Sequence, residues 1–447
     1  MTSVTATAPT TGLQALQELE SARARTLALT AFDELELTRQ HSPLMSPLVW
    51  DLAHIGQQEE HFLLHEVGWH QPAADPVFRP EIAALYDAFR HPRASRIQLP
   101  LLEATAAREH LVRVRGRVSE LLTGNDPLAA DWGPRGGAFI AALVTQHELQ
   151  HIETMLATHQ LRSGPPLLTG IALPPGRAVR GGIDDAVLIP DGPALIGADP
   201  EHEPGSLDNE RPRHAVALGA FRIGRVPVTN AEWVEFIADG GYREPRWWDA
   251  DGWEHCRRNQ LQAPLFWSPD GAGSWTRKRF GAVEVVPPGE PVQHVDFHEA
   301  QAFSRWAGAR LPTEQEWEKA AAGVPNQLVH RSWPWGQQAP GAHLANLGGA
   351  ALRPAPVGAY PQGASAYGVQ QLIGDVWEWT SSQLSPWPGF RPMVYDNYSA
   401  PFFGPDYRVL RGGSWATGPA AVRNSFRNWD LAVRRQIFSG LRLAWDA

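Results

Sequence analysis

The sequence predicts a multidomain protein, with an α-helical bundle followed by a loop-rich α+β domain. Its 447 residues correspond to two or three domains at about 150 residues each. Long helical patterns are confined to the first 161 residues, whereas most of the 19 Trp follow residue 240. The two parts are therefore built differently, and we place the bundle at 1–165, a linker at 166–190 and the second domain at 191–447.

Four long segments of the first domain carry apolar residues at helical spacing. They are residues 13–40, 47–67, 103–123 and 137–161. A shorter helix is expected over 79–91. Four long helices with polar connections favour a bundle, whose core can hold a metal bound by facing helices.

The remainder of the chain reads differently. The stretch 163–192 is rich in Pro and Gly, which is typical of a connecting segment. After it, the sequence predicts two short helices, over 296–309 and 313–321, within Gly-, Pro- and Trp-rich loops. This composition favours a compact α+β domain with little regular structure.

Composition excludes several classes of protein. The formal net charge is −9, whereas broad nucleic-acid binding requires a basic face. A single cysteine, Cys256, excludes a disulfide framework within one chain. No basic stretch followed by an apolar core is visible at the N-terminus, and no apolar run reaches the length of a membrane span. We expect a cytoplasmic monomer that binds neither nucleic acid nor membrane.

Histidines on two of the predicted helices could bind a metal. His147 and His151 are four residues apart and share one helical face, which Gln150 borders. His54 lies among apolar residues of another helix. Three neutral imidazoles would leave positions open on iron or zinc. With 17 His in the chain, such a pair also arises by chance in a helix.

Two alternatives stay open at this point. His147 to His151 reads H-E-L-Q-H, the pattern of zinc proteases in which the Glu is the general base. No H-x-x-G-x-x-H extension follows it, so a zinc hydrolase would need a distant third ligand. The other alternative is a non-catalytic module that binds a ligand, with incidental histidines.

Five strings in the second domain resemble the formylglycine-generating-enzyme or sulfatase-modifying-factor domain, a loop-rich fold related to C-type lectins. They are VPVTN at 226–230, LPTEQEWE at 311–318, GDVWEWT at 374–380, RVLRGGSW at 408–415 and SGLRL at 439–443. The first domain, with its histidines, resembles a DinB-like four-helix bundle. Together and in this order, the two domains resemble the sulfoxide synthases of ergothioneine biosynthesis.

The resemblance implies a non-heme Fe(II) enzyme that uses O2. Members of that family join the thiol sulfur of a cysteine derivative to imidazole C2 of hercynine (N-α-trimethylhistidine). The sulfur leaves as a sulfoxide, and in the actinobacterial type the thiol substrate is γ-glutamylcysteine. Hercynine, γ-glutamylcysteine and O2 are therefore the expected small-molecule partners.

The resemblance also assigns roles to residues of this sequence. The three iron ligands match His54, His147 and His151, and a Gln near the trimethylammonium pocket matches Gln150. Residues that bind the substrates match Arg90, Arg93, Asn428, Trp429 and Asp430. The catalytic tyrosine matches Tyr395, with Tyr398 as the alternative three residues on.

These assignments suit the chemistry of the substrates. Arg binds a carboxylate through two parallel hydrogen bonds, and γ-glutamylcysteine has two carboxylates. A trimethylammonium group cannot donate N–H hydrogen bonds, so the face of Trp429 suits it, and Asp430 would pair with the free ammonium of the γ-glutamyl group. A tyrosine is protonated at neutral pH and can act as an acid.

Two further features concern metals other than iron. Formylglycine-generating enzymes work through a cysteine pair near the stretch that here reads RGGSWATGPAAVRNSFR, which contains no cysteine. Thiol-based copper chemistry is therefore not expected. Domains of this type sometimes hold Ca2+, and Asp375 or Glu378 are the candidates for a structural calcium site.

Overall fold

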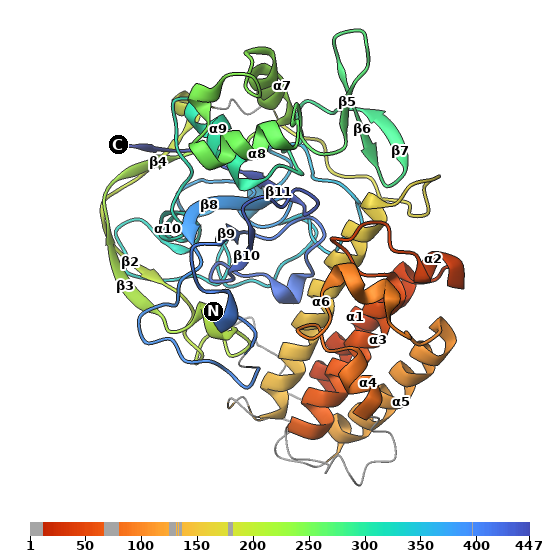
Figure 1. Ribbon diagram of the computed structural model, residues 1–447. Helices are drawn as coiled ribbons and strands as arrows, with labels where there is room; N and C mark the ends of the chain where they lie inside the picture. The colour runs from red at the N-terminus through yellow and green to blue at the C-terminus, as the bar shows by residue number, and fades with distance from the viewer. Residues whose placement is uncertain are drawn as a thin grey trace. The chain divides into compact units, whose positions relative to one another are not determined.

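The computed structural model describes residues 12–66, 80–124, 131, 133, 136–177, 182–395 and 397–447. The chain divides between Gly164 and Pro165 into two compact units (Figure 1). Each unit has its own buried core. Helical and mixed α+β architecture follow one another as the sequence predicts, which confirms the fold class.

The N-terminal unit is built from helices. They are α1 (Gly12–Leu29), α2 (Glu34–Thr38), α3 (Leu48–Glu59), the π-helical η1 (Glu60–Glu66), α4 (Pro80–Leu85), the 3-10 helix η3 (Arg93–Gln98), α5 (Ala104–Thr123) and α6 (Gly137–Leu161). Helix α1 packs along α6, and α3 packs against both α5 and α6. One apolar cluster includes Trp50, Ile55, Tyr86 and Leu111. The unit is therefore held by α1, α3, α5 and α6.

The prediction of one helix over 13–40 is wrong. Helix α1 ends at Leu29, and the short α2 begins at Glu34. Asp33 starts α2 because its side chain accepts a hydrogen bond from the Glu36 amide at 2.9 Å. Asp at such a position favours a new helix start over continuation of the old helix.

Two other predicted helices are shorter than expected. The segment predicted as 47–67 is α-helical to Glu59 and then continues as η1. The helix expected over 79–91 ends at Leu85. Asp87 contributes to this end, because its side chain accepts the Phe89 amide at 2.9 Å and offers the backbone a local alternative to the helix.

A buried ion cluster ties the four long helices together. Arg23 on α1 pairs with Glu59 on α3 at 2.6 Å and with Glu148 on α6 at 2.9 Å. Arg115 on α5 pairs with Glu59 at 2.7 Å. Burial raises the pKa of Glu59, but the two arginines outweigh it and hold this pKa below its usual value. Each charge is paired, as a buried charge must be.

The C-terminal unit combines short strands with short helices. Its strands are β1 (Val187–Ile189), β2 (Gly192–Ile196), β3 (His214–Leu218), β4 (Phe221–Ile223), β5 (Trp267–Pro269), β6 (Trp275–Arg279), β7 (Ala282–Val285), β8 (Trp377–Gln383), β9 (Tyr407–Arg411), β10 (Asn428–Leu431), β11 (Ser439–Leu441) and β12 (Ala444–Asp446). They form sheets in the orders β1-β4-β12, β10-β9-β8-β11, β2-β3 and β5-β6-β7. All pairs are antiparallel except β11 with β8.

The α-helices described in this unit begin at side-chain caps. They are α7 (Asn230–Ala238), α8 (Ala250–Arg258), α9 (Phe297–Trp306) and α10 (Glu314–Ala322). Helices α9 and α10 confirm the two predicted short helices, whereas α7 and α8 were not predicted. Thr229 and Glu232 form a capping box at the start of α7, in the VPVTN string.

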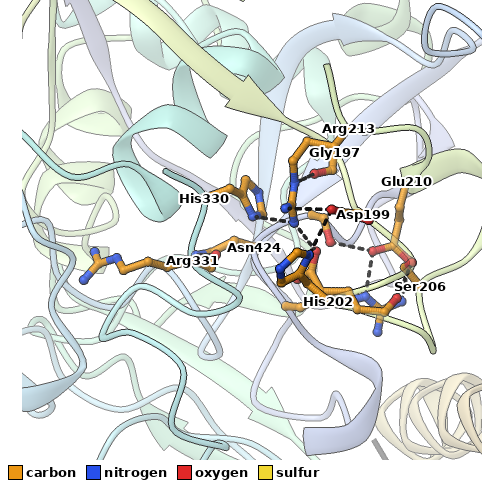
Figure 2. A network of polar contacts seen from close by, with 12 residues as sticks. Gly197, Asp199, His202, Ser206, Glu210, Arg213, His330, Arg331 and Asn424 are labelled. Carbon is orange, nitrogen blue, oxygen red and sulfur yellow. Dashed lines mark hydrogen bonds and ion pairs between the residues drawn. The ribbon is translucent and has the colours of Figure 1, made fainter. Parts of the chain in front are cut away.

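Polar networks hold the irregular segments of this unit. Figure 2 shows Arg213, just before β3, reaching Gly197, Asp199 and His330. His330 in turn lies 2.9 Å from Glu318 of α10. These bonds replace part of the backbone pairing that a larger sheet would provide.

The sequence predicts a linker at 166–190, and described residues of this segment make backbone hydrogen bonds within the C-terminal unit. The Ile171 amide donates to Ala350 at 3.0 Å, and the Arg177 amide donates to Val357 at 3.2 Å. Strand β1 pairs with β4. Within the described part of the chain, none of the helices is long and apolar enough to cross a membrane.

Candidate metal centre and substrate-binding residues

Three histidines converge inside the N-terminal unit. His54 projects from the middle of α3, and His147 and His151 project from one face of α6. One ligand nitrogen from each ring lies within 4.8 Å of the others. The ring centroids are 4.6–5.1 Å apart. The structure thus brings together the three residues that the sequence predicts as metal ligands.

Hydrogen bonds fix which nitrogen of two rings can bind a metal. His54 Nδ1 lies 2.8 Å from the Tyr86 carbonyl oxygen, and His151 Nδ1 lies 2.9 Å from Asp51 Oδ1. Because a carbonyl or carboxylate oxygen only accepts, each Nδ1 carries the proton. Nε2 of each ring then keeps its lone pair. A metal-binding histidine uses its second nitrogen in this way.

The surroundings favour the neutral form of His54 and His147. Burial lowers the pKa of His54 well below its usual value, and the positive charges that His151 and His147 would carry lower it further. Burial likewise lowers the pKa of His147, again helped by His151. A neutral imidazole is the form that binds a metal. The donor set therefore fits a divalent cation such as Fe(II).

The N-terminal unit also carries three of the predicted substrate-binding residues, Gln150, Arg90 and Arg93. Gln150 is half-buried on α6, one residue before His151. Arg90 is exposed in the segment after α4 and pairs with Asp87 at 3.2 Å, and Arg93 is the exposed first residue of η3. Exposed arginines can exchange such a surface pair for a carboxylate of a ligand at little cost.

In the C-terminal unit, the predicted aromatic residues form a chain of contacts. Tyr395 and Tyr398 have ring centroids 6.1 Å apart, and Tyr398 meets Trp429 edge to face at 5.5 Å. Trp429 is half-buried on the edge strand β10, and Phe402 also contacts it at 5.5 Å. Tyr398 thus lies between Tyr395 and the indole of Trp429 in this chain of ring contacts.

The side chains on either side of Trp429 accept hydrogen bonds from the backbone amides that follow them. Asn428 Oδ1 accepts the Trp429 amide at 2.9 Å, and Asp430 Oδ1 accepts the Leu431 amide at 2.8 Å. Asp430 also lies 3.4 Å from Arg434. Asn428, Trp429 and Asp430 therefore follow one another on β10, where successive side chains point to opposite faces and local contacts hold Asn428 and Asp430.

Two comparisons identify the domains. Residues 18–155 match the family model of the DinB superfamily, and residues 172–447 match that of the sulfatase-modifying factor enzyme 1-like domain. A hercynine oxygenase of Mycolicibacterium smegmatis is 59% identical over 434 residues, covering 96% of this chain and 98% of the relative. The hercynine oxygenase of Mycobacterium tuberculosis is 56% identical over 428 residues, covering 96% and 97%. The chain belongs to the hercynine oxygenase family.

Membership of the hercynine oxygenase family makes the chain an oxidoreductase and confirms the resemblance found in the sequence. The second domain also resembles the formylglycine-generating enzyme of Streptomyces coelicolor, which is 34% identical over 253 residues, covering 51% of this chain and 78% of that enzyme. Here Cys256 is buried, and burial raises the pKa of its thiol to about 12. That thiol is protonated at neutral pH and is not a nucleophile.

The structure also argues against a zinc hydrolase in this hercynine oxygenase family member. Glu148 of the H-E-L-Q-H string is buried in the ion cluster with Arg23. Its carboxylate also accepts the Thr26 hydroxyl at 2.8 Å. A general base must reach the substrate's water, whereas this carboxylate is committed to holding α1 against α6.

Two residues that the sequence analysis did not select support the predicted ones. Asp51, buried and three residues before His54, orients His151. An acidic residue one turn from a helical histidine could have pointed to it. Asp208, the first residue of the 3-10 helix η6 (Asp208–Glu210), accepts a hydrogen bond from the Ser399 hydroxyl at 2.7 Å and so anchors the segment that carries Tyr395 and Tyr398.

The candidate calcium ligands are occupied by N–H donors. Asp375 accepts hydrogen bonds from the Ala355 amide and from the side chains of Asn346 and Gln371, at 2.7–2.9 Å. Glu378 accepts from Arg442 and from Trp317 Nε1. Nitrogen donors compete with a cation for the same oxygens, so the structure gives no support to calcium at these two carboxylates.

Proposed function

We propose that the chain is a non-heme Fe(II) enzyme that uses O2 to join γ-glutamylcysteine to C2 of the hercynine imidazole, giving the sulfoxide. The observation that carries the proposal is the convergence of His54, His147 and His151. The names of its full-length relatives support hercynine as the substrate. The chemistry balances, because O2 supplies one atom to the sulfoxide and one to water, which takes the hydrogens of the thiol and of imidazole C2.

His54, His147 and His151 would hold the iron through their unprotonated nitrogens. Bound Fe(II) would supply open positions for the two substrates and O2, together with the electrons that start O2 reduction. Asp51 and the Tyr86 carbonyl orient two of the three rings. Three neutral ligands leave the positive charge of the metal available to an anionic thiolate.

The substrate-binding residues divide by charge. Arg90 and Arg93 would bind the carboxylates of γ-glutamylcysteine, and Asp430 its ammonium. Trp429 would face the trimethylammonium group of hercynine, with Gln150 and Asn428 completing the polar contacts. An aromatic face attracts such a cation with about 0.5–2 kcal/mol.

A tyrosine would donate the proton that the reduced oxygen requires. Tyr395 is the proposed donor, with Tyr398 as the alternative, and Ser399 holds their segment to Asp208. The assigned groups all belong to one chain, so the proposal needs no second protein. We place the enzyme in the cytoplasm as a monomer, in line with the sequence.

The test is an oxygen-consumption assay with metal-loaded protein. The apoprotein is loaded anaerobically with Fe(II) or with Zn(II), and hercynine, γ-glutamylcysteine and then O2 are added. We expect O2 consumption only with Fe(II) and both substrates present, and none with the His147→Ala variant. Oxygen-independent hydrolysis with Zn(II) would contradict the proposal in favour of a zinc hydrolase, and silence with both metals would favour a binding module.

A further inference from the structure

Arg96 is separated from the candidate metal ligand His54 by the ring of Trp50, and none of the functions assigned above involves it. It is a buried residue of η3, with 5% of its surface exposed. Its guanidinium carbon sits 3.5 Å from the centroid of the Trp50 ring. Trp50, itself fully buried, stacks on the imidazole of His54 with centroids 4.4 Å apart and planes 17° apart. Arg96, Trp50 and His54 therefore form a continuous stack that ends on a metal ligand.

The same guanidinium holds the backbone around Arg90. Arg96 Nε donates to the His91 carbonyl at 2.9 Å, and Nη2 donates to the Ala88 carbonyl at 3.4 Å. These carbonyls lie on either side of Arg90 in the sequence. Nη1 donates to the Ser46 hydroxyl at 2.6 Å, two residues before α3 begins at Leu48. One side chain thus bridges the start of α3 and the segment between α4 and η3.

We propose that Arg96 is a positioning residue that couples the metal ligand His54 to the arginine-bearing segment 88–93. The planar guanidinium can lie flat on the indole while its N–H groups donate to three acceptors, whereas a lysine ammonium has three donors but no plane that can stack. The guanidinium stacks on the Trp50 indole, and the indole packs flat on the His54 ring. The His54 ring therefore cannot turn about its hydrogen bond to Tyr86 without displacing Trp50. Movement of segment 88–93 is transmitted to the same stack.

This inference rests on the proposed metal site, and its test begins with the metal alone. Apoprotein is titrated with Co(II), whose visible absorption reports ligand geometry. We expect Arg96→Lys, which keeps the charge and loses the planar stack, to weaken Co(II) binding by roughly 10-fold or more, as other outer-sphere changes do. The absorption band of the bound ion is expected to shift as well.

Arg162→Lys is the matched control. Arg162 is another arginine of this unit, partly buried, which pairs with Glu36 after the last turn of α6, 11 residues beyond His151. The control should bind Co(II) with the affinity and spectrum of the wild type. With iron-loaded enzyme, Arg96→Lys should raise the KM for γ-glutamylcysteine more than the KM for hercynine, whereas Arg162→Lys should change neither.

The outcomes separate the two proposals. Wild-type protein that binds no Co(II) would contradict the proposed metal site itself. Wild-type binding that Arg96→Lys leaves unchanged in affinity and spectrum would overturn the role of Arg96. If Arg96→Lys does not fold, Ser46→Ala removes only the Nη1 hydrogen bond. That variant should still shift the spectrum, and an unshifted spectrum would overturn the inference.

Discussion

At the scale of the residue, Asp51 shows how a buried carboxylate serves a metal site without touching the metal. Its Oδ1 accepts from His151 Nδ1 at 2.9 Å, which fixes the tautomer and the direction of the ring. The carboxylate also makes the imidazole a stronger ligand than a neutral acceptor would. The side chain is fully buried, so solvent does not weaken this effect.

Asp51→Asn should lower the affinity for Fe(II) or Co(II) by about 10- to 100-fold. The amide oxygen can still accept from His151, so the ring keeps its direction and the loss reports the missing charge. Metal titration of the apoprotein measures it. An unchanged dissociation constant would remove Asp51 from the site.

The two tyrosines can be separated by rate and by product. Tyr395→Phe should slow sulfoxide formation by about 100-fold or more, in the range of a lost general acid, and divert the thiol to sulfinic acid. Tyr398→Phe should have the smaller effect, although Tyr398 is the ring that contacts Trp429. Mass detection of both products decides, and a full rate and unchanged product for Tyr395→Phe would transfer the role to Tyr398 or to neither.

At the scale of the element, the segment that carries the tyrosines depends on one buried acid. Asp208 is bound to Ser399 by a hydrogen bond of 2.7 Å. Burial raises the pKa of Asp208 to about 6 from an ordinary value of 3.8. The pKa of Asp208 is therefore higher in the folded state than in the unfolded state. The contribution of Asp208 to the free energy of unfolding is complete below pH 3.8 and is lost as the pH rises through 6.

Asp208→Asn tests this sign. The asparagine can still accept from Ser399 and does not ionise. Between pH 4.5 and 7.5, the free energy of unfolding of the wild type should fall relative to that of the variant by about 2 kcal/mol, since each pKa unit is worth about 1.4 kcal/mol. Urea unfolding at the two pH values measures it, and parallel stabilities would show that the pKa of Asp208 is not raised.

The segment with Arg90 and Arg93 should act on one substrate only. Replacing both arginines by Gln is expected to raise the KM for γ-glutamylcysteine by about 100-fold, since a charged hydrogen bond is worth about 1.5–3 kcal/mol, and to leave the KM for hercynine nearly unchanged. Both side chains are exposed, so folding should not suffer. Steady-state kinetics with each substrate varied in turn decides, and equal effects would remove their assigned role.

Helices were predictable from the sequence where the spacing of apolar residues alone determines their bounds. Helices α5 and α6 follow the predicted segments closely because apolar spacing persists over their full length. The break between α1 and α2 depends on the cap at Asp33, which competes with a continuous apolar pattern. Strands of three to five residues such as β4 and β9 leave too short a pattern to read, since their pairing is decided by partners far away in the chain.

At the scale of the whole molecule, the order of the two domains and the family were predictable from strings and histidines, and the comparisons confirm them. The supporting residues were not. Asp51, Arg96 and Asp208 act on partners from other elements, through contacts that only the folded chain creates. The residue roles taken from the resemblance stay predictions until variants test them.

The most direct test of the account is a turnover of the Fe(II)-loaded protein with hercynine, γ-glutamylcysteine and isotopically labelled O2. The account predicts one product with the mass of both substrates plus one oxygen atom less two hydrogens, and with the labelled oxygen on sulfur. His147→Ala should yield none of it. A wild-type protein that consumes O2 only to oxidise the thiol, without joining the two substrates, would contradict the account.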